Sequence, residues 1–220
     1  IDNPKPIEKI TYREMRELSY AGFSVFHEDA LIPAFKAKIP VCVKNTNNPE
    51  APGTLIVAER TAITNPVTGI ACDVGFCTIY VSKFLMNKEI GFGRRLLQIL
   101  EDENLSYEHT PSGIDNISVI LREKQLTPDK EKRVLERIKQ ELKVDDVFIE
   151  RNLALVMIVG EGMRRNIGVA DRATRALAKA NVNIEMINQG SSEVSMMFGI
   201  KDSDAERALK SLYAEFYQNS

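Results

Sequence analysis

The feature that most constrains the fold of this chain is an internal repeat. Residues 78–121 align with residues 155–198 without a gap, at an offset of 77 residues. Identical residues occupy the paired positions Met86/Met163, Ile90/Ile167, Gly91/Gly168, Arg95/Arg172, Leu100/Leu177, Asn104/Asn181, Glu108/Glu185, Gly113/Gly190 and Ser118/Ser195. A period of this length indicates two successive versions of one structural unit, here called the first and the second repeat.

Each repeat is predicted to contain the same succession of elements: strand, glycine-containing loop, helix, strand, turn and strand. Apolar β-rich runs predict the strands, and apolar residues at helical spacing predict the helices. In the first repeat these elements are expected over 76–81, 91–103, 106–110 and 117–121. In the second repeat they are expected over 153–159, 169–180, 183–187 and 194–200.

A further helix follows each set of strands. Thr127 is a suitable N-cap with Pro128 at the first helical position, and Asp202 or Ser203 opens the last helix. The first repeat then ends in a strand over 146–150, which completes the βαββαβ order of the ferredoxin-like fold. The second repeat lacks this last strand. An unassigned strand over 69–73 could pair there, which would make the first repeat an insertion in the second. The expected class is α+β.

The segment before the repeats has a different pattern. Thr11 and Glu14 have the spacing of a capping box at the start of a helix. The expected elements are helices over 11–26 and 32–37 and strands over 39–43 and 54–58. Residues 61–68 contain Asn-Pro and Thr-Gly and are the best candidate for a boundary.

Charge and cysteine usage exclude several classes of function. The formal net charge is −2 and basic residues alternate with acidic ones, so neither nucleic acid nor an acidic membrane is an expected partner. Cys42, Cys72 and Cys77 form no Cys-x-x-Cys pair, so no disulfide framework and no metal site is expected. No apolar run approaches the roughly 18 residues of a membrane span. A cytoplasmic protein is expected.

Several stretches resemble a known family. Residues 158–170 contain Ile-Val-Gly-Glu-Gly-Met and Ile-Gly-Val-Ala, and residues 183–195 read Asn-Ile-Glu-Met-Ile-Asn-Gln-Gly-Ser-Ser-Glu-Val-Ser. Both are similar to the second ACT domain, an amino-acid-binding module, of the aspartokinases. Residues 10–14, 25–27 and 43–46 resemble the end of the same enzymes' kinase domain.

The resemblance implies three parts. Residues 1–58 would be the C-terminal remnant of an α/β amino-acid-kinase domain. Residues 77–151 would form the first ACT domain, and residues 59–76 together with 152–220 would form the second.

The resemblance also implies an activity for the parent protein. Aspartokinases transfer a phosphoryl group from ATP, with Mg²⁺, to aspartate, which gives 4-phospho-L-aspartate on the route to lysine, threonine and methionine. The chain is expected to be inactive by itself, with no catalytic residue and no cofactor. It lacks the family's glycine-rich segment with the catalytic lysine and its Thr-Asp-Pro-Arg segment. Ser24 stands where many members have a nucleotide-contacting lysine.

An amino-acid effector is expected to bind where a helix start meets a polar strand. The backbone N–H groups of residues 88–93 suit a carboxylate, and the acidic segment 106–108 suits an ammonium group. By the resemblance, the effector-contacting residues of the first repeat are Met86, Glu89, Phe92, Gly93, Ser106, Tyr107 and Glu108. Their counterparts in the second repeat are Met163, Asn166, Val169, Ala170, Asn183, Ile184 and Glu185. Met86 and Phe92 could instead be core residues, and Glu108 and Glu185 could be edge-strand charges.

The expected effector is lysine, with threonine second or acting jointly. The expected assembly is a homodimer or higher homo-oligomer formed through ACT–ACT pairing. A stand-alone regulatory subunit without catalytic activity and a dimerisation module without ligand are the alternatives. Residues 10–54 favour an allosteric kinase, because a free-standing sensor has no need of them.

Overall fold

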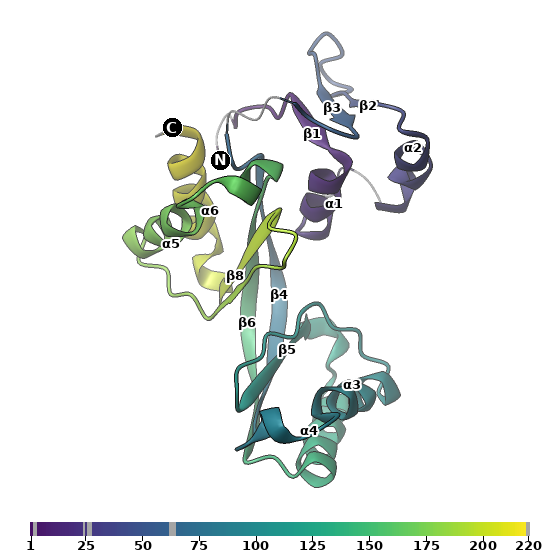
Figure 1. Ribbon diagram of the computed structural model, residues 1–220, viewed down its shortest axis with the longest axis vertical. Helices are drawn as coiled ribbons and strands as arrows, with labels where there is room; N and C mark the ends of the chain where they lie inside the picture. Colours follow the sequence, from purple (N-terminus) through teal and green to yellow (C-terminus); the bar gives the residue numbers. More distant parts are fainter. Residues whose placement is uncertain (2–3, 24, 26–27, 62–64, 219–220) are drawn as a thin grey trace. The chain divides into compact units, whose positions relative to one another are not determined.

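Two 14-residue strands, β4 (Gly69–Ser82) and β6 (Asp146–Val159), organise the computed structural model of the chain (Figure 1). They are neighbours in a five-stranded sheet of order β5-β4-β6-β8-β7. The structure describes residues 1, 4–23, 25, 28–61 and 65–218. It divides into two compact units, Ile1–Asp73 with Leu155–Ser220 and Val74–Ala154.

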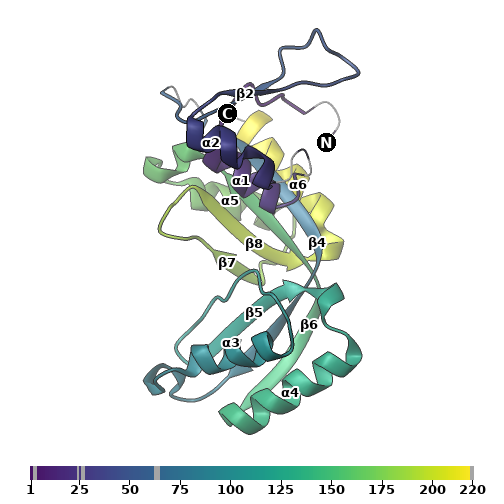
Figure 2. The same cartoon turned by 90° about the vertical axis from the view of Figure 1, so that its right-hand side faces the viewer.

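The Val74–Ala154 unit holds the first repeat. Its elements besides β4 and β6 are η2 (Met86–Lys88), α3 (Phe92–Asp102), β5 (Asn116–Arg122), η3 (Glu123–Gln125) and α4 (Pro128–Leu142). Strand β5 pairs antiparallel with β4, from Phe76 opposite Arg122 to Ser82 opposite Asn116. Helices α3 and α4 pack against each other beside these strands (Figure 2).

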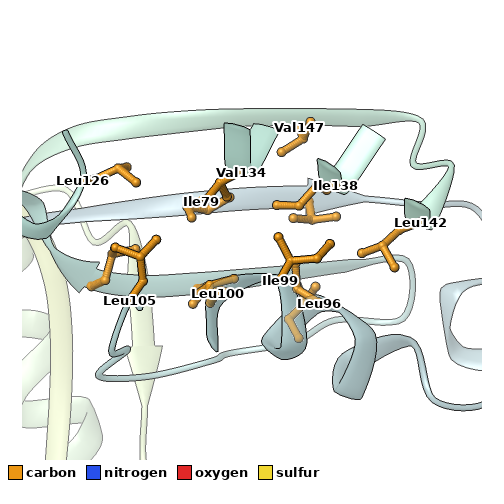
Figure 3. Packing of buried hydrophobic residues seen from close by; sticks show 14 of the residues in the cluster. Ile79, Leu96, Ile99, Leu100, Leu105, Leu126, Val134, Ile138, Leu142 and Val147 are labelled. Carbon is orange, nitrogen blue, oxygen red and sulfur yellow. The ribbon is translucent and has the colours of Figure 1, made fainter. Parts of the chain in front are cut away.

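The core of this unit lies between the two helices and β4. Leu96, Ile99 and Leu100 project from one face of α3, and Val134, Ile138 and Leu142 project from one face of α4 (Figure 3). They meet Ile79 of β4, and each of the seven side chains is at most 1% exposed. The apolar residues whose helical spacing predicted α3 form the face that is buried here.

The other unit holds the second repeat and the segment before the repeats. Its second-repeat elements are η4 (Glu161–Arg165), α5 (Val169–Lys179), β7 (Met186–Asn188), β8 (Ser195–Lys201), η5 (Asp202–Asp204), α6 (Ala205–Tyr213) and the π-turn η6 (Ala214–Gln218). The preceding elements are β1 (Lys9–Thr11), α1 (Tyr12–Tyr20), η1 (Glu28–Leu31), α2 (Ile32–Ala37), β2 (Val41–Val43) and β3 (Thr54–Val57). Strands β1, β3 and β2 form a small mixed sheet.

The repeat extends to the backbone conformation. Left-handed residues occur in pairs separated by the repeat offset: Gly75 with Asn152, Gly91 with Gly168, and Asn104 with Asn181. Gly91 and Gly168 precede α3 and α5, with φ of 77° and 93°. Because a side chain at such φ values is strained, the paired glycines are explained by the turn into each helix.

The expected α+β class with ferredoxin-like repeats is confirmed, as are several local predictions. Thr11 and Glu14 form a reciprocal capping box at the start of α1. Helix α2 spans Ile32–Ala37 as predicted. Thr127 caps α4 by accepting from the N–H of Lys130, with Pro128 in the first turn.

Other predictions are wrong in their boundaries. Helix α1 ends at Tyr20, six residues early, because Gly22 takes a φ of 116° that a helix does not allow. Residues 106–110, all of them described, form no strand; only an isolated bridge joins His109 to Ile120. The strands expected separately at 69–73 and 76–81 are one strand, β4. Ser24 and His27 lie outside the described residues.

Candidate functional site

The two glycine-containing loops have the same construction. Loop 1 is residues 83–91 and loop 2 is residues 160–168; each leaves a long strand, makes a 3₁₀ turn and enters a helix at a left-handed glycine. In the part of the chain that the structure describes, a Cβ added at Gly91, Gly93 or Gly168 would meet no heavy atom within 4 Å outside its own stretch of chain. The start of each helix is therefore open, and its N–H groups suit a carboxylate.

Glu89 is held in loop 1 by two cations. Lys83 Nζ lies 2.5 Å from its Oε2, and Arg95 of α3 pairs with its Oε1. The hydrogen bond from Lys83, together with that from Arg95, lowers the pKa of the Glu89 carboxyl below its usual range. A ligand ammonium group would have to replace one of these cations to reach this carboxylate. Lys83 and Arg95 were not among the predicted site residues; Arg95 carried a signal, since it matches Arg172 in the repeat.

Met86 and Phe92 lie in the core of the first repeat. Their exposed fractions are 8% and 4%, and both pack in the cluster that contains Ile99. Met163 and Val169 take the same places in the second repeat, each 5% exposed. At these four positions the side chain is therefore buried rather than presented to a ligand.

The segment Ser106–Glu108 lies beside η3 and the end of β5. Gln125 Oε1 accepts from the Ser106 N–H at 3.1 Å, and the Glu108 N–H donates to the Ile120 carbonyl at 2.7 Å. Glu108 is 3.6 Å from Arg122, with 17% of its side chain exposed. Tyr107 is 47% exposed.

The two halves of the first candidate site are not brought together within one protomer. Loop 1 begins at the other end of β5, where the Lys83 N–H donates to the Asp115 carbonyl at 2.9 Å. At about 3.3 Å per residue, the five residues from Asp115 to Ile120 separate the two halves by roughly 17 Å along the strand.

The second repeat has the same separation with a different charge environment. The Gly160 N–H bonds to Val194 at the start of β8, whereas the Glu185 N–H bonds to Gly199 near its end. Gly199 occupies the position of Arg122, so the cation beside Glu108 has no equivalent there. Glu185 instead accepts from Asn183 Nδ2 at 2.9 Å. Asn166 and Ala170 are exposed at the start of α5, and Ile184 is half-buried.

The described residues contain no group of three or more His, Cys, Asp or Glu side chains that could hold a metal ion. Within the same described part of the chain, no helix is both long and apolar enough to cross a membrane.

Comparison with known proteins shows what the chain is similar to. The ACT domain family matches residues 156–216. The chain is 60% identical over 217 residues to aspartokinase 3 of Bacillus subtilis, covering 99% of this chain and 48% of that protein. The crystal structure of Clostridium acetobutylicum aspartate kinase, 44% identical, matches with a TM-score of 0.93 over 98% of this chain and 50% of that one. The chain is similar to aspartokinases along nearly its whole length.

The chain thus spans about half the length of the aspartokinases it matches, namely their regulatory region. The expected resemblance to the end of the kinase domain followed by ACT domains is confirmed. Escherichia coli aspartokinase III in complex with lysine and aspartate shares the fold, with a TM-score of 0.77 over 97% of this chain and 47% of that one. At 24% identity this likeness concerns the fold alone.

Proposed function

We propose that this chain is the feedback-control region of a cytoplasmic aspartate kinase that converts ATP and L-aspartate to 4-phospho-L-aspartate with Mg²⁺. Its first repeat binds an end-product amino acid, lysine first and threonine second. The effector inhibits by binding the inactive arrangement of the parent enzyme better than the active one. The proposed domain bounds are those expected from the sequence: 1–58, 77–151, and 59–76 with 152–220.

The observation that carries the proposal is the separation of loop 1 from Ser106–Glu108 along β5. In a two-fold symmetric dimer the same surface of both protomers forms the interface, and the two copies of that surface run in opposite directions. One end of the first repeat can therefore lie against the other end of the first repeat in its partner. Loop 1 of one protomer can then face Ser106–Glu108 of the other. The open helix start binds the effector's carboxylate, and Glu108 binds its side-chain ammonium. The exposed Ile90 and Tyr107 supply apolar surface for such a pair.

The choice of lysine rests on charge. Glu89 and Glu108 are half-buried carboxylates that pair with cations, so a ligand ammonium group can take the place of Lys83 beside Glu89 or of Arg122 beside Glu108. A solved structure of Escherichia coli aspartokinase III, which has the same fold, contains lysine. A free-standing regulatory subunit is the weaker candidate. A sensor without a kinase has no need of the segment that forms β1, α1, α2, β2 and β3, and this segment matches the longer kinase from Clostridium acetobutylicum.

Calorimetry tests the effector and the site together. Lysine is expected to bind this chain with a dissociation constant below about 1 mM. Glu108→Ala is expected to weaken binding about 10-fold to 100-fold, the effect of removing a charged hydrogen-bond acceptor. Glu185→Ala is the matched control and should have a much smaller effect. If lysine, threonine and methionine all fail to bind, the sensing function is wrong; equal losses in both variants would exclude the first repeat as the main sensor.

A mixing experiment tests whether two protomers share the site. Glu89→Ala damages the half of the site in loop 1 and Glu108→Ala damages the half in Ser106–Glu108, so each variant alone should bind lysine poorly. After unfolding and refolding the two together, mixed dimers keep one intact site, and about a quarter of the wild-type stoichiometry should return. A site contained in a single protomer would give no recovery on mixing.

A further inference from the structure

Loops 1 and 2 each begin with a backbone N–H that donates to a carboxylate. In the first repeat the Phe84 N–H donates to Asp145 Oδ2 at 2.6 Å. In the second repeat the Glu161 N–H donates to Glu14 Oε1 at 2.8 Å. Phe84 and Glu161 are separated by the repeat offset of 77 residues. A carboxylate therefore accepts a hydrogen bond from the equivalent backbone N–H of both loops.

The two carboxylates come from different places in the chain. Asp145 stands directly before β6, and its N–H donates to the Ser82 carbonyl at 2.9 Å. The repeat offset puts Thr68 at the equivalent position before β4, and its N–H makes the equivalent bond, 2.7 Å to the Val159 carbonyl. The second repeat thus has a hydroxyl where the first has a carboxylate.

Glu14 supplies the carboxylate that Thr68 lacks. Its Oε1 accepts from Thr68 Oγ1 at 2.7 Å as well as from Glu161, and its Oε2 accepts from the Thr11 N–H at 2.8 Å. Glu14 is 0% exposed, and Nη2 of Arg60 lies 3.3 Å from Oε1. The charge is therefore buried, paired with a guanidinium and hydrogen-bonded at both oxygens.

We propose that Glu14 is the positioning residue through which loop 2 and helix α1 move together. A buried carboxylate that loses its partners is strongly unfavourable, so a displacement of loop 2 has to carry α1 with it. Since α1 belongs to the segment that resembles the end of the kinase domain, Glu14 joins the second repeat to the catalytic side of the parent protein. This last step rests on the proposed regulatory function. The connection that Glu14 makes between α1 and loop 2, here called the joint, does not.

Amide hydrogen exchange of this chain, followed by NMR, tests the joint. Glu14→Gln removes the charge with little change in shape and should speed exchange about tenfold or more at Glu161 and in the first turn of α1, with loop 1 unchanged. Asp145→Asn is the matched variant and should speed amide exchange in loop 1 while loop 2 stays protected. Glu8→Gln, an exposed carboxylate before β1, should change neither. Wild-type exchange at Glu161 in Glu14→Gln, or equal effects on both loops, overturns the proposal.

A double variant distinguishes a specific loss of the joint from a general loss of stability. Combining Glu14→Gln with Thr68→Asp gives the second repeat the carboxylate arrangement of the first, beside the same Arg60. It should restore protection at Glu161 and leave the first turn of α1 as fast as in Glu14→Gln alone. This variant also decides the case in which Glu14→Gln does not fold. A double variant that stays unfolded, or that restores α1 as well as loop 2, contradicts the proposal.

Lysine then tests what passes through the joint. In the wild-type chain, a change in exchange that saturating lysine causes in loop 2 should be accompanied by a change in α1. In the double variant lysine should bind with similar affinity and change loop 2 while leaving α1 unchanged. An equal response of α1 in both proteins overturns the coupling. If lysine does not bind the wild-type chain, the effector assignment fails, while the exchange data without ligand still decide whether Glu14 joins loop 2 to α1.

Discussion

Replacing Ile99 by alanine should lower the free energy of unfolding by about 2–5 kcal/mol, as measured by urea denaturation. Ile99 projects from α3 into the core of the Val74–Ala154 unit and is 0% exposed. It points toward Ile138 of α4, so truncation leaves a cavity that the surrounding core can close only in part (Figure 3). The loss combines the transfer free energy of the missing methylene and methyl groups with the cost of that cavity.

Two further variants make this prediction specific. Ile99→Val removes one carbon and should cost about 0.5–1.5 kcal/mol. Ile114→Ala removes the same atoms as Ile99→Ala from a side chain that is 70% exposed, and should change stability by less than about 0.5 kcal/mol. Similar losses for Ile99→Ala and Ile114→Ala would contradict the packing described for α3.

The second large effect is expected at Gly160, where alanine should destabilise the chain by about 3 kcal/mol. A Cβ there would lie 2.1 Å from the carbonyl oxygen of Pro66 and 3.0 Å from the backbone nitrogen of Thr68. Both atoms are backbone, so the clash cannot be relieved by turning a side chain. The backbone of Gly160 itself is extended, with φ of 177°, so close approach alone requires glycine.

The matched control for this substitution is Gly190→Ala. Among the described residues, no heavy atom outside the adjoining residues lies within 4 Å of a Cβ at Gly190, and the change should stay within about 0.5 kcal/mol. The bond from the Thr68 N–H to the Val159 carbonyl, 2.7 Å in the native chain, should lose exchange protection in Gly160→Ala only. Unchanged protection of Thr68 would show that the two strands can separate to admit the methyl group.

The sequence predicted most of the local structure because the relevant interactions are local. The capping box of Thr11 and Glu14, the Thr127-Pro128 start of α4 and the apolar faces of α3 and α5 depend on residues within a few positions of one another. Where a boundary depended on distant contacts, it was missed. The segment 106–110 was predicted to be a strand, yet it forms only an isolated bridge from His109 to Ile120. Its predicted role in effector binding stays a prediction.

The sequence alone determined that this chain contains two ferredoxin-like repeats and a different preceding segment, because an offset that preserves glycines, apolar residues and charges preserves the fold they specify. Only the tertiary structure decided that β4 and β6 each run unbroken through a repeat boundary and that loop 1 and Glu108 lie at opposite ends of β5. It also decided the second role of Glu14. In the sequence Glu14 is a helix-capping residue. In the folded chain the same carboxylate accepts a hydrogen bond from the N–H of Glu161, 147 residues away, as Asp145 accepts one from the N–H of Phe84 in the first repeat. Glu14 takes this place because the residue equivalent to Asp145 is Thr68, which has no carboxylate.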